Sequence, residues 1–318
     1  MKHQFQNNFK NLRMNRRDLL KAGAAMVAAQ LPVLAYCKNL TPSMEIIKHT
    51  IPGTSEQLPA IGMGTWQTFD IGNNADEREN IKQVLKTFAE KGGTVIDSSP
   101  MYGRSEDVVG ELAGELKIIP ELFMATKVWT RGKQAGIRQM QQSMQEMRAN
   151  PMDLMQVHNL VDYHTHIQTL KQWKSEGKIR YIGITHYTDS AHDDLAELIR
   201  TEDLDFIQVN YSINDRHADR RLLPLAKDRG VAVLINRPYS GGSLFSRVKG
   251  KELPDWAAAY DITSWGQFFL KFIISHPAVT CAIPATSKVH HMEDNMGAAY
   301  GKLPDEQARK EMIRYFEQ

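Results

Sequence analysis

The chain has 318 residues, of which 39 are Lys or Arg, 37 are Asp or Glu, and 42% are hydrophobic. A chain of this length can bury a large core by itself, and its two cysteines, Cys37 and Cys281, are too few for a disulfide framework. Of the net charge of +2, residues 1–36 hold +5 and residues 37–318 therefore hold −3, which argues against a nucleic-acid partner for the body of the chain.

The amino-terminal segment 1–36 has the layout of a removable export signal. The paired residues Arg16 and Arg17 precede the uncharged stretch 22–35, and Val33-Leu34-Ala35 offers a cleavage site of the A-x-A kind. The uncharged stretch is shorter than the roughly 20 residues that a transmembrane helix needs. The alternative is a disordered basic extension or a leader that is not used.

The arginine pair, followed by Leu19-Leu20-Lys21, resembles a twin-arginine signal, with Asn15 where Ser or Thr is usual. The resemblance implies that the twin-arginine machinery exports the folded protein to the periplasm. The mature chain is then expected to start near Tyr36 or Cys37. If the signal is not used, we expect the protein in the cytoplasm.

Beyond residue 50, short apolar runs alternate with polar stretches of helical periodicity. The predicted strands are 58–63, 95–97, 122–127, 152–158, 179–184, 206–210, 231–236 and 279–283. The predicted helices are 75–91, 104–116, 134–148, 163–176, 190–201, 218–229, 264–275 and 288–300, with a final helix at 304–317. Eight strand–helix units predict an α/β fold, a (β/α)8 TIM barrel, within residues 37–318.

A doubly wound open sheet is the main alternative to the barrel. It would carry a G-x-G-x-x-G turn after its first strand. Gly62-Met63-Gly64 lacks the third glycine and leads into Thr65-Trp66 rather than into a helix, which favours the barrel. The longest irregular stretch, 237–262, follows the seventh predicted strand, and loops of such length are usually functional.

Four polar side chains stand at or just after the ends of three successive predicted strands, namely Asp97, Tyr102, Lys127 and His158. Catalytic groups of (β/α)8 barrels lie at the carboxyl ends of the strands, so we expect these four side chains at one mouth. Taken singly, they would be a strand-end cap, a loop aromatic, a solvated charge and a core histidine. Their joint placement favours catalysis.

Four ordered motifs resemble those of the aldo/keto reductase family over about residues 45–318. The segment Asp97–Glu106 resembles D-x-A-x-x-Y-G-x-S-E, and Gly62–Trp66 resembles G-x-G-T-W. Met124–Lys127 resembles the lysine motif of the family's third strand, and Asp153–His158 resembles D-L-x-x-x-H of the fourth. The resemblance implies a monomeric reductase that acts on a small-molecule aldehyde or ketone with hydride from NADPH.

The chemistry of the four side chains agrees with this implication. Carbonyl reduction places a hydride on carbon and a proton on oxygen, and the hydroxyl of Tyr102 can donate that proton. We expect Lys127 to lower the pKa of Tyr102 and Asp97 to hold the charge and position of Lys127. His158 is expected to hydrogen-bond and orient the carbonyl oxygen.

The resemblance also assigns residues that hold the nicotinamide. Gln208 matches the residue that binds its amide, whereas Thr185-His186 stand where the family usually has Ser-Asn. Asn236 stands in the place of an aromatic residue that stacks on the nicotinamide, so either Tyr211 supplies that stacking instead or the cofactor is held more loosely. The segment that follows resembles the loop that crosses the pyrophosphate, and it contains Pro238, Ser240, Gly241 and Leu244.

The segment around the eighth predicted strand and helix matches the site for the adenosine part of the cofactor. Thr286, Ser287 and Lys288 precede a helix amino terminus, which favours phosphate. Asn295 matches the adenine contact, and His291 stands where many family members have an arginine for the 2′-phosphate. NADPH is therefore the expected cofactor, with NADH as the alternative.

Three large side chains, Trp66, Met101 and Trp129, are expected to line the substrate pocket, since they flank the catalytic mouth in the sequence. The two tryptophans favour a flat, apolar or aromatic carbonyl compound, although packing at the barrel rim is the plainer interpretation. We expect no metal ion, because no Cys/His cluster has the spacing of zinc ligands. His164 and His166 are interpreted as a helix face.

Two further classes of function remain as alternatives. The altered Thr185-His186 and Asn236-Arg237 positions are compatible with a nicotinamide-binding redox sensor or partner subunit that turns over slowly. A sugar- or metabolite-binding module on a barrel scaffold would leave the four catalytic side chains unexplained. Cofactor binding without turnover indicates the sensor, and no cofactor binding indicates the binding module.

Overall fold

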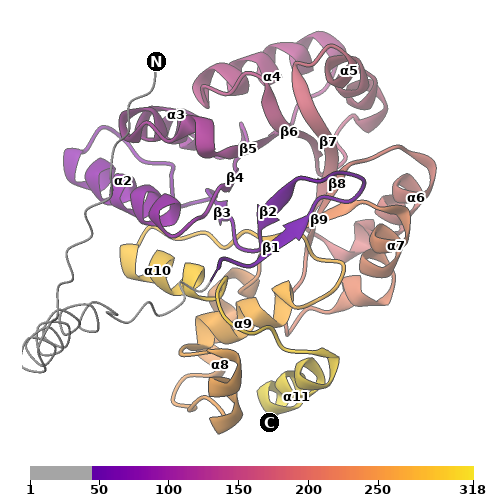
Figure 1. Cartoon of the computed structure of the whole chain (residues 1–318). Helices are drawn as coiled ribbons and strands as arrows, with labels where there is room; N and C mark the ends of the chain where they lie inside the picture. The colour runs from indigo at the N-terminus through magenta and orange to yellow at the C-terminus, as the bar shows by residue number, and fades with distance from the viewer. Residues whose placement is uncertain (1–44) are drawn as a thin grey trace, which may run out of the picture. The chain divides into compact units, whose positions relative to one another are not determined.

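The computed structural model describes residues 45–318, which form one compact unit (Figure 1). The predicted export signal at 1–36 lies outside the described residues. Within 45–318, no helix is long and apolar enough to span a membrane.

Ten strands are present in the described part of the chain. They are β1 (Lys48–Thr50), β2 (Gln57–Pro59), β3 (Met63–Gly64), β4 (Val95–Asp97), β5 (Phe123–Val128), β6 (Met152–His158), β7 (Ile179–His186), β8 (Phe206–Asn210), β9 (Ala232–Asn236) and β10 (Cys281–Ala282). The helices are α2 (Ala75–Glu90), α3 (Ser105–Leu116), α4 (Lys133–Glu146), α5 (Tyr163–Ser175), α6 (His192–Thr201), α7 (Leu222–Arg229), α8 (Ser243–Arg247), α9 (Trp265–Ile274), α10 (Val289–Gly297) and α11 (Glu306–Glu317).

Strands β3 to β10 pair in parallel and in chain order, as successive strand–helix units require. Parallel bridges from Ile61 to Ala282 and from Gly64 to Ala285 join the first strand to the last and nearly close the ring. Figure 1 shows the helices arranged around this ring of strands. The predicted (β/α)8 barrel is thereby confirmed.

The amino-terminal hairpin of β1 and β2 closes the end of the barrel at which the strands begin. Ile51 and Leu58 of the hairpin region are buried against Phe123, Leu154 and Phe206, which point into the barrel from the first halves of their strands. In a strand every second side chain faces the same side, so the intervening residues face the helices instead. This apolar plug leaves the opposite end of the barrel for polar groups.

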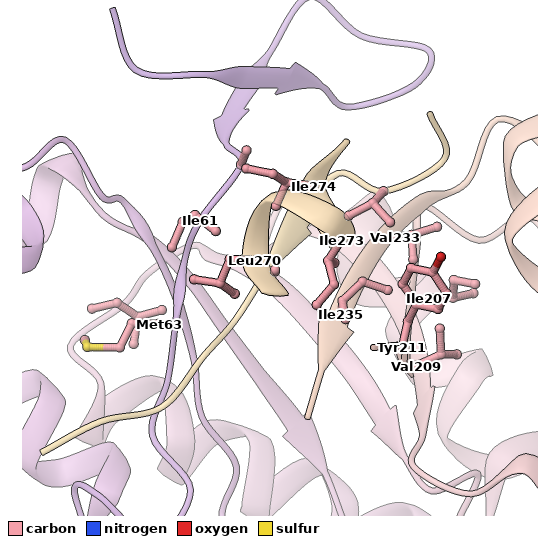
Figure 2. Packing of buried hydrophobic residues seen from close by; sticks show 14 of the residues in the cluster. Ile61, Met63, Ile207, Val209, Tyr211, Val233, Ile235, Leu270, Ile273 and Ile274 are labelled. Atoms are coloured by element: carbon pink, nitrogen blue, oxygen red, sulfur yellow. The ribbon is translucent and has the colours of Figure 1, made fainter. Parts of the chain in front are cut away.

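Helix α9 is apolar on nearly all sides, and the reason is its position. Leu270 and Ile273 pack in the layer between the barrel strands and the helix (Figure 2). On its other side, the ring of Phe269 lies 5.8 Å from Phe245 of α8 and 5.8 Å from Phe316 of α11. A helix covered on both faces has no need of a polar stripe.

Two predicted elements differ from the structure. The predicted strand 58–63 is divided, because residues 57–59 belong to the hairpin and only Met63–Gly64 continue into the barrel. The apolar sequence pattern does not distinguish the hairpin strand from the barrel strand, because both carry buried residues. The stretch 237–262, expected to be irregular, contains helix α8 and a 3₁₀ helix at Asp255–Tyr260.

Candidate active site

The carboxyl end of the barrel interior is lined with polar side chains. Inward-facing positions recur every second residue along a strand. On these strands the inward residues are apolar near the hairpin and polar at the carboxyl end. Thus Leu154 is followed by Gln156 and His158 on β6, and Phe206 is followed by Gln208 on β8. The barrel is apolar where the hairpin closes it and polar at the other end.

The four predicted catalytic residues meet at this mouth. The ammonium of Lys127 lies 2.6 Å from Oδ2 of Asp97, and both side chains are buried. Lys127 lies 5.1 Å from the ring centroid of Tyr102, and the rings of Tyr102 and His158 meet edge to face at 5.9 Å. The strand ends therefore bring a phenol, an ammonium with its carboxylate, and an imidazole together.

Two glutamines hold the remaining oxygen of Asp97. Oδ1 accepts hydrogen bonds from Nε2 of Gln156 at 3.0 Å and from Nε2 of Gln208 at 2.8 Å. Gln156 was not singled out in the sequence. Its inward parity on β6, two residues before His158, is the signal that would have found it.

The ion pair fixes the charge of Lys127. Burial opposes the ammonium, but Asp97 and Tyr102 outweigh burial and raise the pKa of Lys127 above its usual value. The Lys127 ammonium also donates to the carbonyl oxygen of Ser98 at 2.7 Å. The buried lysine is therefore a permanent cation at neutral pH.

The pKa of Tyr102 differs from the expectation. Burial raises this pKa and outweighs the opposing effect of Lys127, so the net shift is upward rather than downward. The sequence showed the cation but not how deeply the phenol is buried. Tyr102 is consequently a neutral phenol, with its proton in place, at neutral pH.

His158 is also neutral. Burial, and the nearby charges of Lys127 and His186, lower its pKa to about 2. Its Nδ1 lies 2.9 Å from Oγ of Ser99, which itself accepts from the backbone N–H of Met101 at 3.4 Å. This arrangement favours donation from Ser99 to Nδ1, which places the ring proton of His158 on Nε2.

A buried carboxyl group lies behind the mouth. Glu106 accepts hydrogen bonds from the hydroxyl of Thr126 and, at 3.0 Å, from Ser143. Burial raises its pKa to about 7. Thr126 faces outward on β5, next to the inward-facing Lys127, so Glu106 supports the strand that carries the lysine.

The residues assigned to the nicotinamide lie at the ends of β7, β8 and β9. Thr185 is buried and its hydroxyl lies 3.3 Å from Oε1 of Gln208, which in turn donates to Asp97. His186 is half-buried, and its Nδ1 accepts from Thr188. Asn236 points inward from β9, and its Oδ1 is buried without a hydrogen-bond partner among residues 45–318.

The prediction for Tyr211 is wrong. Its side chain is fully buried and its ring stacks on that of Phe272 at 5.7 Å. Figure 2 shows Tyr211 beside Ile207 and Val209, which face outward from the barrel. Its hydroxyl donates to Asp219 and accepts from Arg309. Asn210 is the last inward residue of β8, so Tyr211 has the opposite parity and faces the helix layer rather than the nicotinamide.

The predicted pyrophosphate loop follows β9. Gly241 and Gly242 have φ of 67° and 89°, and Ser240 has φ of 50°, so consecutive residues take the left-handed conformation. The side chain of Leu244 is buried in the core, which leaves only its backbone for any contact with a ligand. Pro238, two residues before Ser240, is buried.

The residues assigned to the adenosine part surround the start of α10. Lys288 is the N-cap residue of α10, and its backbone N–H donates to Oγ1 of Thr286 at 3.1 Å. The carbonyl of Ser287 accepts from Asn80 on α2. Asn295 is buried and its Oδ1 accepts from Tyr239 at 2.6 Å, which links α10 to the loop after β9.

Large exposed side chains surround the mouth. Trp66, Met101 and Trp129 are 49%, 38% and 41% exposed, and the ring of Trp129 lies 6.4 Å from that of His158. Tyr187 is a fourth large side chain, 49% exposed, which sequence reasoning missed. It stacks on the ring of His186 at 5.8 Å, beyond the end of β7.

Comparisons with known proteins identify the family of this chain. The profile of the aldo/keto reductase family matches residues 60–311. The chain is 30% identical over 257 residues to an NADH-specific methylglyoxal reductase of Escherichia coli, which covers 70% of this chain and 76% of that protein. It is 27% identical over 246 residues to the methylglyoxal reductase YeaE of the same species, covering 75% and 84% of the two chains.

Solved structures of aldo/keto reductases also resemble this chain. An aldo/keto reductase from Klebsiella pneumoniae, crystallised in complex with NADP and acetate, superimposes with a TM-score of 0.70 at 26% identity. The match covers 85% of this chain and 96% of that one. The protein is therefore a member of the aldo/keto reductase family and an NAD(P)H-dependent oxidoreductase.

Proposed function

We propose that the protein reduces an aldehyde or ketone with NADPH and that Tyr102 donates the proton to the carbonyl oxygen. The observation that carries this proposal is the contact of Tyr102 with the buried Lys127–Asp97 pair and with His158 at the open end of the barrel. A neutral phenol beside a permanent cation keeps its proton until charge develops on the substrate oxygen. The cation then stabilises the phenolate that proton donation leaves behind.

His158 has a separate task in this proposal. With Ser99 at Nδ1, the neutral ring donates from Nε2 and orients the carbonyl oxygen without competing as an acid. The bound cofactor supplies the hydride for the carbonyl carbon. Proton donation by Tyr102 completes the alcohol, and solvent returns the proton to the phenolate.

The residues present are suited to a nicotinamide. Gln208 and Thr185 hold each other at the centre of the mouth, and Oδ1 of Asn236 is a buried acceptor that has no partner within residues 45–318. An amide donor of the nicotinamide would satisfy that acceptor. Asn236 would thus replace the usual stacking aromatic with a hydrogen bond.

NADPH is proposed as the preferred cofactor, with NADH as the alternative. Lys288 at the start of α10 provides a cation, and the helix amino terminus provides N–H donors, for a 2′-phosphate. His291, in contrast, is a neutral group at neutral pH, because burial and its neighbours His290 and Lys288 lower its pKa. Because one relative is named as NADH-specific, the activity test includes NADH as well as NADPH.

A flat or aromatic aldehyde is the proposed substrate class, because Trp66 and Trp129 offer exposed ring faces at the mouth. Two relatives are named methylglyoxal reductases, so methylglyoxal is the second compound to try. A higher kcat/KM for benzaldehyde than for methylglyoxal would support an aromatic substrate, and the reverse would support methylglyoxal.

The test follows oxidation of NADPH and NADH by the full chain with both aldehydes, beside Tyr102→Phe. The kcat of Tyr102→Phe is expected to be lower than that of the parent chain by a factor of roughly 10²–10⁴. Binding of NADPH, measured by fluorescence, should change less than about twofold, since the hydroxyl is reserved for the substrate. Equal kcat in the two proteins would overturn the role of Tyr102.

The alternative is a nicotinamide-binding sensor with little turnover. Asn236-Arg237 at the end of β9 is the departure from the family that favours it. Tight binding of NADPH together with no oxidation over a wide aldehyde and ketone panel would support the sensor and contradict the reductase.

For the amino-terminal segment we propose use as a twin-arginine export signal, on the sequence pattern alone. The twin-arginine route carries folded proteins, which allows the cofactor to be loaded before export. Replacing both Arg16 and Arg17 with Lys is expected to abolish periplasmic recovery, whereas Arg13→Lys should leave it intact. Amino-terminal sequencing of the periplasmic protein should begin near Tyr36 or Cys37. An uncleaved chain found only in the cytoplasm would contradict the proposal.

A further inference from the structure

Gln156 is a fully buried amide on β6, and both of its polar ends face the ion pair at the mouth. In the sheet it lies beside Lys127 of β5 on one side and beside Gly183 of β7 on the other. Its Nε2 donates to Oδ1 of Asp97 at 3.0 Å, and its Oε1 accepts from Nε2 of Gln208 at 3.5 Å. Gln156 is thus joined to the carboxylate that holds Lys127 and to the second amide that binds this carboxylate.

Gly183 leaves room for this arrangement. It faces into the barrel from β7, two residues before Thr185. A Cβ at this position would lie 3.2 Å from Cγ of Gln156 and 2.9 Å from the carbonyl oxygen of Phe206, so a larger residue would displace at least one of them. The missing side chain allows Gln156 of β6 and Gln208 of β8 to meet across β7.

The two glutamines differ in what else they hold. Gln208 donates to Oδ1 of Asp97 at 2.8 Å, but its Oε1 also accepts from Thr185, and its position is the one assigned to the nicotinamide amide. Among residues 45–318, the side-chain amide of Gln156 hydrogen-bonds only to Asp97 and Gln208. Gln156 is therefore the donor to Asp97 that has no second acceptor.

These hydrogen bonds set the direction of the Asp97 carboxylate. With Oδ1 held by amide donors, Oδ2 faces the ammonium of Lys127 at 2.6 Å. An amide stabilises a carboxylate without adding a charge, and it does not titrate, so the contact from Gln156 is the same at every pH. An apolar side chain in its place would remove one donor from a buried carboxylate, which would then be held less firmly.

We propose that Gln156 is a positioning residue for carbonyl reduction, which acts by holding Asp97 against Lys127. The ammonium of Lys127 thereby stays beside the phenol of Tyr102, 5.1 Å from the centroid of its ring. The inference rests on the proposed function of Tyr102, because Lys127 affects the reaction by stabilising the phenolate that proton donation leaves behind. Gln156 should therefore affect kcat much more than the affinity for NADPH.

Gln156→Leu removes the amide and keeps a side chain of similar size. With Asp97 held less firmly, kcat for NADPH and benzaldehyde should fall by about ten- to a hundredfold. The Kd for NADPH, measured by fluorescence, should change by less than about twofold. A loss of kcat without a loss of cofactor binding distinguishes positioning of the ion pair from a general loss of structure.

Gln156→Glu makes the same position titratable. A protonated carboxyl group donates to Asp97 as the amide does, whereas an ionised one repels Asp97 and destabilises the phenolate of Tyr102. Burial and the charge of Asp97 should raise the pKa of the introduced group above its usual value of about 4.3. Relative to the parent chain, kcat should stay within about threefold at pH 5 and fall as the pH rises toward 9.

The other titratable groups around Asp97 are the same in the parent and in Gln156→Glu, so the ratio of their rates removes the effect of these groups. They are Tyr102, Glu106, Lys127, His158, His186 and Cys281. Burial raises the pKa of Glu106 to about 7 and lowers that of His186. A fall in the ratio is therefore due to the introduced carboxyl group.

A second readout needs no turnover. In protein labelled with ¹³C at the tyrosine Cζ atoms, the NMR signal of Tyr102 is the one that disappears in Tyr102→Phe. In Gln156→Glu without cofactor, this signal should show an inflection beyond any that the parent chain shows. Its midpoint should lie at the pH at which the relative kcat falls, because one ionisation causes both changes.

Gln267→Leu and Gln267→Glu are the matched controls. Gln267 is a buried amide on α9 and donates to Oδ1 of Asp294 at 2.9 Å, outside the mouth. The two variants make the same chemical changes beside a carboxylate that does not hold Lys127. At saturating NADPH, their kcat should stay within about twofold of the parent value from pH 5 to pH 9, and the Tyr102 signal should titrate as in the parent chain.

Two outcomes would overturn the inference. One is a kcat of Gln156→Leu equal to that of the parent chain. The other is a Gln156→Glu that is as slow at pH 5 as Gln156→Leu, which would show that the donor has no role. If Gln156→Leu does not fold, a rate ratio of Gln156→Glu to parent that is constant from pH 5 to pH 9 overturns the inference instead.

Failure of the proposed function gives a different result. In that case the parent chain oxidises no NADPH, or Tyr102→Phe keeps the parent kcat, whatever residue stands at position 156. The NMR titration then decides whether Gln156 acts on Tyr102. An additional inflection in Gln156→Glu supports the link, and a titration identical to that of the parent chain overturns it.

Discussion

Two fully buried lysines lie in different regions of this barrel and are held in different ways. Lys127 at the mouth pairs with the carboxylate of Asp97 at 2.6 Å. Lys271 on α9 has no carboxylate within salt-bridge distance in the described residues, and instead donates to the backbone carbonyls of Tyr260, Tyr300 and Lys302 at 2.6, 2.6 and 3.0 Å. Both are satisfied, but only Lys127 faces a group that can exchange a proton.

The two sets of partners give the two lysines different effects. Three fixed carbonyls turn Lys271 into a clamp that ties the carboxyl-terminal segments to α9. At the mouth, the Asp97 carboxylate raises the pKa of Lys127 against burial, which keeps a cation beside the phenol of Tyr102. The partners of a buried lysine thus decide whether it only ties segments together or also sets the charge beside an ionisable group.

The largest effect is expected for Lys127→Met. Loss of the ammonium leaves the buried carboxylate of Asp97 without its charge partner, which should lower the free energy of unfolding by about 3–5 kcal/mol. The phenolate of Tyr102 also loses its stabilising cation, so kcat should fall by roughly 10²–10⁴. Urea unfolding and the NADPH oxidation assay measure the two effects on one preparation.

Lys271→Met is the matched comparison. It leaves three buried carbonyls without their donor and should cost about 3–5 kcal/mol of unfolding free energy. The kcat of the folded protein should remain within about twofold of the parent value, because Lys271 lies outside the mouth. A loss of kcat as large as that of Lys127→Met would remove the distinction between the two regions.

A smaller effect is expected at Glu106, between the mouth and the helix layer. Its pKa rises from 4.5 to about 7 on folding, so the folded state binds the proton more tightly than the unfolded state. Its contribution to stability is therefore present below pH 4.5 and is lost as pH rises through 7, by up to about 3 kcal/mol.

Glu106→Gln tests this contribution. The uncharged amide should remove that part of the pH dependence and make the variant more stable than the parent chain at pH 8, as measured by urea unfolding between pH 5 and pH 8. Parallel stability curves for the two proteins would show that Glu106 does not titrate in this range.

Ser99→Ala should have the smallest effect. Without the hydroxyl, Nδ1 of His158 loses its partner and the Nε2–H tautomer is no longer favoured, which should lower kcat by about tenfold and leave NADPH binding unchanged. Ser99→Thr keeps the hydroxyl and should restore most of kcat. If Thr and Ala behave alike, Ser99 acts by packing and not by positioning the ring.

The barrel, and the meeting of Asp97, Tyr102, Lys127 and His158 at its mouth, could be predicted because both depend on short-range pattern. Parallel strands alternate with helices, and strand ends share one edge, so Asp97, Lys127 and His158 had to meet if the strands were placed correctly. Strand parity would also have excluded Tyr211 and found Gln156. Tyr211 was assigned wrongly, and Gln156 was not singled out, because neither interpretation took account of the side of the strand that a residue faces.

Other features depend on packing between distant elements. The raised pKa of Tyr102 reflects burial that surrounding loops supply, and the bond from Tyr239 to Asn295 joins residues that lie 56 positions apart. Single-sequence patterns carry no information about such contacts.

The most direct test of the central claim is the pH dependence of carbonyl reduction in a single turnover. The full chain, saturated with NADPH, is mixed with benzaldehyde by pH jump, and the rate of NADPH oxidation is recorded from pH 6 to pH 11. Because the pKa of Tyr102 is raised and that of His158 is about 2, we expect a constant rate through neutral pH. The rate should fall only above the ordinary tyrosine pKa of about 10. A rate that already falls through pH 7 would contradict proton donation by a neutral Tyr102 and would assign the step to another group.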